Sequence, residues 1–204
     1  MSILEDLMSL SARVQRARNN ALVVTYSDPA GREVAVGRQK GSAAVLLGFK
    51  NGGKADYTVE GNATRLEVAV AATTKVSRDG TPLGSIVGQG TYARIESAAA
   101  TLLAQIHPYE GAKADAAWSH RLTGPDGEQV GTLILMRSAS AWSLNDFVYW
   151  TATWDMTGVG LKAPSAGAAL HLDAPVEDDL ADLLIAALLD VSTLPRGYLS
   201  QNVP

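Results

Sequence analysis

The stretch DDLADLLIAALLDV, residues 178 to 191, decides how the rest of the chain must fold. Between Leu180 and Val191, only Asp182 and Asp190 are polar. The large apolar residues of this stretch cannot share one narrow stripe of a helix, and a helix that is apolar on nearly every side is a buried helix. We therefore expect a central helix over residues 178–194, enclosed by the rest of the protein.

The rest of the chain consists largely of short segments with the sequence pattern of strands. Runs rich in Val, Leu and aromatic residues are separated by Gly, Pro, Asp and Asn at spacings of about 8–12 residues, which is typical of an antiparallel sandwich or barrel. A barrel of eight strands fills its interior with side chains, whereas about twelve strands leave room for a helix. The sequence thus predicts a mainly β fold over residues 21–204: a closed antiparallel barrel of about twelve strands around the hydrophobic C-terminal helix.

The first 20 residues show a helical period instead. Ile3, Leu7, Leu10 and Val14 recur at helical spacing, and arginines follow them. We expect an N-terminal amphipathic helix over residues 1–20 that packs on the barrel or on a second copy. A basic helix lying on an anionic membrane is the alternative.

Two dipeptides, Asp79-Gly80 and Asp126-Gly127, stand between candidate strands. Gly accepts the positive φ of a type I′ turn, so both dipeptides predict two-residue hairpins.

Composition limits the function classes. A chain of 204 residues with 47% hydrophobic and 19% charged residues is expected to form one globular domain, and its net charge of −4 gives no attraction to nucleic acid. The absence of cysteine excludes disulfides and thiolate sites. No apolar run is long enough for a transmembrane helix, and acids near the start argue against a signal peptide, so we expect a cytoplasmic protein.

Positive charge gathers near the N-terminus. Residues 1–54 carry eight Lys/Arg and four Asp/Glu, a balance of +4. Within this part, Arg32, Arg38, Lys40 and Lys50 form a candidate site for phosphate headgroups or an anionic partner. Protection of an exposed strand edge is the other interpretation.

An aromatic segment supplies the second candidate binding surface. Trp150 and Trp154 are an even number of residues apart and share a face if the segment is a strand. They line either a ligand or partner site or the core.

Catalytic and metal sites have weaker patterns. His120 is a candidate base, and no serine stands in a nucleophile motif. The acids Asp173, Glu177, Asp178 and Asp179 suit either a hard cation or the positive end of the helix dipole. We predict no cofactor, no metal and no catalytic residue.

The order of elements resembles the tubby C-terminal-like superfamily, which includes the phospholipid scramblases and LURP-one-related proteins. The likeness is carried by VVTYSDPAGREVAVGRQK (23–40), TKVSRDGTPLGSIVGQG (74–90), TGPDGEQVGTLILMR (123–137) and LHLDAPVEDDLADLLIAALLDV (170–191). The resemblance implies a twelve-stranded barrel threaded by its C-terminal helix. In scramblases an acidic segment beside that helix is assigned to a cation, whereas the tubby lipid-headgroup site has no convincing match here.

These features lead to the hypothesis of a non-enzymatic binding or scaffold module that binds anionic lipid headgroups at the inner membrane face. One alternative is a protein-interaction module without lipid affinity. Another is an enzyme or small-molecule binder with a barrel-mouth pocket around His120. The pattern indicates no particular oligomeric state.

Overall fold

A computed structural model describes residues 8–17, 21–41, 55–61, 64–108, 117–136 and 167–193, and every structural statement below concerns these residues. They contain twelve strands and one helix. The elements are β1 (Ser9–Arg16), β2 (Leu22–Ser27), β3 (Glu33–Gln39), β4 (Ala55–Gly61), β5 (Thr64–Val70), β6 (Thr73–Arg78), β7 (Thr81–Gln89), β8 (Tyr92–Ser97), β9 (Leu102–Ile106), β10 (Ala117–Thr123), β11 (Gln129–Met136), β12 (Gly167–Leu172) and α3 (Asp178–Thr193).

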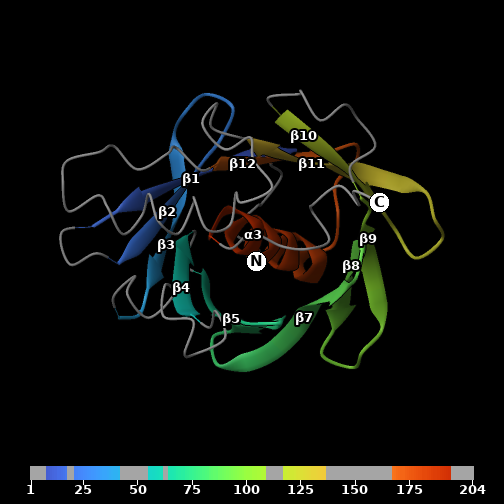
Figure 1. Ribbon diagram of the computed structural model, residues 1–204, viewed down its shortest axis with the longest axis horizontal. Coiled ribbons are helices and arrows are strands. Elements are labelled where there is room, and N and C mark those ends of the chain that lie inside the picture. The colour runs from blue at the N-terminus through green and yellow to red at the C-terminus, as the bar shows by residue number, and fades with distance from the viewer. Residues whose placement is uncertain are drawn as a thin grey trace.

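The strands form one closed antiparallel barrel (Figure 1). Each strand pairs with its neighbours in sequence, and β1 closes the barrel by pairing with β12 as well as with β2. Closure leaves no long free sheet edge, which is the feature that exposes open sheets to aggregation. The predicted fold class, a closed barrel of about twelve strands with a C-terminal helix, is confirmed.

Alternation of side chains gives the barrel its two surfaces. In β5, for example, Thr64, Leu66, Val68 and Val70 are buried, and the residues between them are more exposed. Because successive side chains of a strand point to opposite faces, this pattern directs one set to the interior and the other to solvent.

Helix α3 fills the interior that the strands enclose (Figure 1). All seven residues from 183 to 189 have an exposed fraction of 0%, which confirms the predicted buried helix. Two strands approach it closely at glycines: a Cβ built on Gly37 would lie 3.1 Å from Leu189 Cδ1, and one built on Gly84 would lie 3.0 Å from Leu183 Cδ1. The missing side chains at these two positions make room for the helix.

The N-terminal helix prediction is wrong over residues 9–16, which form β1 and belong to the barrel. Leu10 and Val14 fit a period of four residues and also a period of two, and in the strand they point inward together with Ala12. Residues 9–16 pair with the edges of both β2 and β12, and this pairing favours a strand. Tertiary contacts therefore override the local helical pattern. Residues 1–7 and 18–20 lie outside the described residues.

The hairpin predictions are confirmed at one dipeptide and wrong in detail at the other. Asp79 and Gly80 both have positive φ, 49° and 82°, as a type I′ turn requires. At Asp126-Gly127 only Gly127 has positive φ, 86°, and its N–H donates to the Gly124 carbonyl. That turn is therefore longer than the two residues expected.

The loop between β8 and β9 forms a turn similar to the one at Gly127, but its residue with positive φ is not a glycine. The N–H of Ala100 donates to the Ser97 carbonyl, and Ala100 has a φ of 60°. An alanine in the left-handed region is disfavoured by its Cβ.

We predict that Ala100→Gly raises the free energy of unfolding by about 0.5–1 kcal/mol, because relief of the left-handed strain exceeds the added entropy of the unfolded chain. Urea denaturation measures this change. The matched change Ala98→Gly, in the same loop at a residue without positive φ, should lower stability. Equal effects at both positions would contradict the prediction.

Substitution at the two glycines that face the helix should destabilise the barrel. We predict a loss of about 1–3 kcal/mol for Gly37→Ala, because Leu189 must move away from the new methyl group. Gly84→Ala should cost more, since its methyl group also meets the backbone carbonyl of Glu96 on the neighbouring strand. Urea denaturation measures both changes, and urea midpoints equal to that of the wild-type protein would contradict this packing.

Candidate functional site

The predicted basic patch is divided between the two ends of β3. Arg32 lies in the turn before β3, where its Nε is 3.1 Å from Asp28 Oδ2. Lys40 follows the other end of β3, about 25 Å away at the usual rise of a strand. Only Arg38 and Lys40 come together, and Lys50, Trp150 and Trp154 lie outside the described residues.

Arg38 and Lys40 lie on the outer surface of β3–β5, which we call the β3–β5 face. Arg38 Nη1 is 3.9 Å from Glu60, and Lys40 Nζ is 3.9 Å from Glu67. Arg65 also reaches Glu67, at 3.9 Å. These side chains are more than 40% exposed, so each ion pair is weak, but together they leave a surface of mixed charge.

His120 points into the barrel and has an exposed fraction of 0%. Its Nδ1 lies 3.0 Å from the carbonyl oxygen of His107, and because a carbonyl only accepts, Nδ1 carries the proton. Burial lowers the pKa of His120, with the hydrogen bond to His107 acting in the opposite direction. A neutral imidazole held by the backbone is a structural histidine in this setting.

Of the other two histidines, His171 is exposed on β12, and His107 is half-buried just after the end of β9. Nε2 of His107 is 2.8 Å from the Thr123 hydroxyl, and Nδ1 of His171 is 2.8 Å from the Ser9 hydroxyl. Sequence patterns gave no signal for the contact between Ser9 and His171, because the two residues are 162 positions apart. They are directly opposite in the pairing of β1 and β12, which is an ordinary cross-strand contact.

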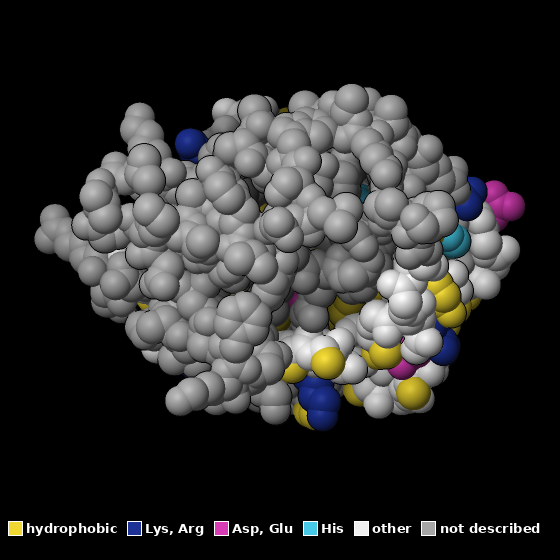
Figure 2. Space-filling model, in the orientation of Figure 1, with side chains coloured by type: hydrophobic (Ala, Val, Ile, Leu, Met, Phe, Trp, Pro, Cys, Tyr) yellow, Lys and Arg dark blue, Asp and Glu magenta, His cyan; other side chains and the backbone are white. Residues whose placement is uncertain are grey.

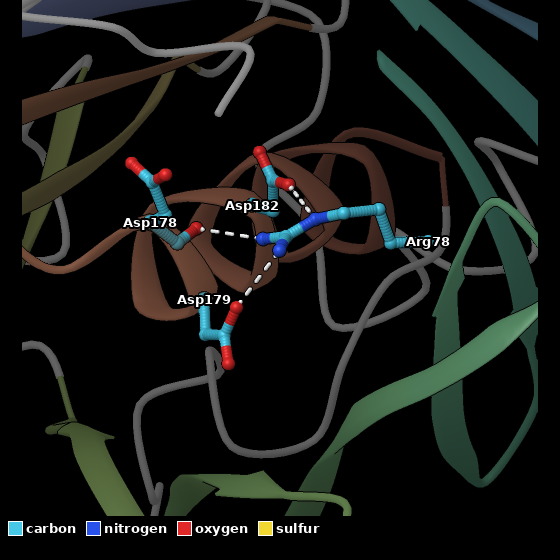
Figure 3. A network of polar contacts seen from close by, with 4 residues as sticks. All are labelled: Arg78, Asp178, Asp179 and Asp182. Atoms are coloured by element: carbon cyan, nitrogen blue, oxygen red, sulfur yellow. Dashed lines mark hydrogen bonds and ion pairs between the residues drawn. The ribbon is translucent and has the colours of Figure 1, made fainter. Parts of the chain in front are cut away.

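The acids at the helix start form a charged cluster around one arginine from β6 (Figure 3). The guanidinium of Arg78 donates from Nε to Asp182 at 2.7 Å, from Nη1 to Asp179 at 2.9 Å and from Nη2 to the Asp178 carbonyl at 3.1 Å. Burial opposes the charge of Arg78, but Asp182 and Asp179 outweigh it and raise the pKa. We call these four residues the Arg78 cluster.

The remaining acids near the helix start do not assemble around a cation. Asp173 accepts a hydrogen bond from Gln129 Nε2 at 3.0 Å, and Glu177 is exposed. In the described part of the chain, no group of three or more His, Asp or Glu side chains is placed to hold a metal ion. Asp178 and Asp179 lie in the first turn of α3, where the positive end of the helix dipole favours acids.

Two further polar contacts hold the helix deeper in the barrel. Thr74 Oγ1 donates to Asp190 Oδ1 at 2.7 Å, and the Tyr26 hydroxyl donates to the Ile185 carbonyl at 3.3 Å. Tyr57 lies in the same interior, and its burial, together with Asp190, raises the pKa of its hydroxyl although Thr193 acts against them. The polar groups described inside the barrel thus orient α3.

Comparison with known proteins adds no family to this description. No family model, curated protein or solved structure matches the chain. The site must therefore be interpreted from its own geometry. Among the described residues, no helix has the length and apolar character needed to cross a membrane.

The Arg78 cluster yields a stability prediction. We expect Arg78→Met to lower the free energy of unfolding by about 3–5 kcal/mol, because it leaves the fully buried Asp182 without its guanidinium. The double variant Arg78→Met/Asp182→Leu should recover most of this loss. Chemical denaturation with a double-mutant cycle measures the coupling.

Asp179→Asn is the matched control, because the Asp179 side chain is 61% exposed and its ion pair should contribute less than about 1 kcal/mol. If Arg78→Met and Asp179→Asn unfold at the same denaturant concentration, the buried pair does not hold the helix as described.

Proposed function

We propose that this chain is a non-enzymatic binding module that contacts a protein partner through its outer surface. The single observation that carries the proposal is the filled interior: α3 occupies the space in which other barrels hold a ligand. Recognition is then left to the outer faces and rims of the barrel.

The state of His120 favours a binding role over an enzymatic one. A general base needs access to a substrate proton and a pKa near the working pH. His120 is fully buried, donates to a backbone carbonyl and has a lowered pKa. These properties suit packing better than catalysis.

The charge pattern of the β3–β5 face favours a protein over an anionic bilayer. Arg38 and Lys40 each face a carboxylate, of Glu60 and of Glu67. Elsewhere on the molecule, the described side chains visible at the lower centre and right of Figure 2 also mix both charges with apolar groups. An anionic membrane attracts clusters of uncompensated Lys and Arg, whereas protein interfaces use complementary charges of both signs. Binding to anionic lipid headgroups is the competing hypothesis, which the flotation experiment below tests.

The strand order also supports kinship with the tubby-like superfamily as part of this proposal. Twelve strands in sequence order, followed by a helix inside the barrel, are what that resemblance implies. Kinship of this kind supports a non-enzymatic binding role and leaves the partner to be identified by experiment.

We predict that reversing the charges of Arg38 and Lys40 to Glu weakens capture of a specific partner at least about ten-fold, because like charges then meet across the interface. Quantitative pull-down with the immobilised protein measures the change. Arg13→Glu/Arg121→Glu makes the same charge change at exposed residues of β1 and β10 and should leave capture intact.

Flotation with phosphatidylserine vesicles at low salt tests the competing outcome. The wild-type protein should remain with the soluble fraction. Binding that falls with salt and is lost in Arg38→Gln/Lys40→Gln would replace the protein-partner proposal with headgroup recognition.

A further inference from the structure

We propose that Thr81 is a phosphorylation site, and that a phosphate on it competes with the acids of α3 for Arg78 and so loosens the anchor of the helix. Thr81 begins β7, directly after the turn residues Asp79 and Gly80. The proposal concerns the fold of the barrel and does not depend on the partner that the outer surface binds.

The sequence around Thr81 combines two features that protein kinases recognise. Thr81 is followed by Pro82, and it is the only serine or threonine of the 204-residue chain that precedes a proline. Proline at this position is what proline-directed kinases select. Arg78 stands three residues before Thr81, where many kinases select a basic residue. Such a motif identifies a site only where the structure presents it to an enzyme.

The structure presents Thr81 at an exposed hairpin tip. Residues 79–82 are four consecutive exposed residues, and Leu83 is the first buried residue of β7. Pro82 has no N–H and donates no hydrogen bond to the neighbouring strand. The acceptor hydroxyl and the proline that follows it are therefore both accessible on the folded barrel.

Ser97 shows what a weaker candidate looks like in the same structure. It also has an arginine three residues before it, Arg94, but it is followed by Ala98 in place of a proline. Its Oγ accepts a hydrogen bond from the Thr101 N–H at 3.2 Å and so helps to hold the loop between β8 and β9. Thr81 is the residue at which motif and exposure coincide.

Arg78 is the direct cross-strand partner of Thr81. The two residues flank the hairpin turn in register, as the last residue of β6 and the first of β7. Side chains of such a pair project from the same face of the sheet, with Cβ atoms about 4.5–5.5 Å apart. Figure 3 shows the Arg78 guanidinium directed at the first turn of α3. A phosphate on Thr81 Oγ1 therefore lies within reach of this guanidinium.

The modification is an ordinary phosphoryl transfer. A kinase moves the γ-phosphoryl group of ATP to Thr81 Oγ1, the hydroxyl proton passes to the catalytic base of the kinase, and ADP leaves. The product carries a charge of about −1.5 to −2 at pH 7 and three strong acceptor oxygens. Arginine is well suited to bind such a group because its planar fork matches phosphate geometry.

The new phosphate weakens the Arg78 cluster in two ways. Guanidinium donors that turn to the phosphate are withdrawn from Asp182, which is fully buried and lies 2.7 Å from Arg78 Nε. The phosphate also adds negative charge beside Asp179 and Asp182, and these like charges repel each other. Since a buried carboxylate without its partner is strongly unfavourable, the first turn of α3 loses its anchor.

Incubation of the full chain with ATP and a proline-directed kinase, followed by peptide mapping, tests the modification. We expect one phosphate, on Thr81, and none in Pro82→Ala, which changes an exposed residue. Failure of the wild-type protein to accept phosphate at Thr81 would overturn the proposal. A synthetic peptide of residues 74–88 then shows whether the sequence or the fold is the cause.

Chemical denaturation of the phosphorylated protein tests the effect on the helix. Phosphorylation should raise the equilibrium constant for unfolding about ten-fold or more, because it disturbs a buried ion pair. Thr81→Glu should act in the same direction, whereas Thr81→Gln, of the same size without the charge, should not. A phosphorylated protein as stable as the unmodified one, or more stable, would overturn the competition for Arg78.

The Arg78→Met/Asp182→Leu background identifies the target of the new charge. Without the guanidinium and the buried carboxylate, Thr81→Glu and Thr81→Gln should unfold at the same denaturant concentration. If Thr81→Glu lowers stability equally in this background and in the wild-type protein, the charge acts through the hairpin itself and the proposal is overturned.

Discussion

The enclosure of α3 is the constraint on which the rest of this structure depends. A helix that is apolar on nearly all sides has no face to offer to water, so it requires a wall around its full circumference. Twelve strands, in turn, enclose more space than their own side chains fill. Each buried Leu or Ile of the helix contributes about 1.5–3 kcal/mol, and the same contacts fill the barrel. Helix and barrel therefore stabilise each other, and neither has an apolar partner without the other.

Polar contacts give this apolar packing a single arrangement. A smooth hydrocarbon cylinder would allow α3 to slide or rotate at little energetic cost. Asp182 near its first turn and Asp190 near its last are both bonded to β6, through Arg78 and Thr74. Two buried carboxylates at different heights on one strand define both the depth and the rotation of the helix. Their role resembles that of polar residues that select one register in a coiled coil.

The sequence predicts the parts of the fold that depend on local pattern. The buried helix, most strands and the Asp79-Gly80 hairpin follow from periods and turn residues. Strand β1 does not, because Leu10 and Val14 suit two periods and only the edges of β2 and β12 decide between them. For the candidate site, proximity in sequence did not predict proximity in space, since Arg32 and Lys40 lie at opposite ends of β3. The partners of the helix acids could not be predicted from the sequence either, because Arg78 and Asp182 are 104 positions apart.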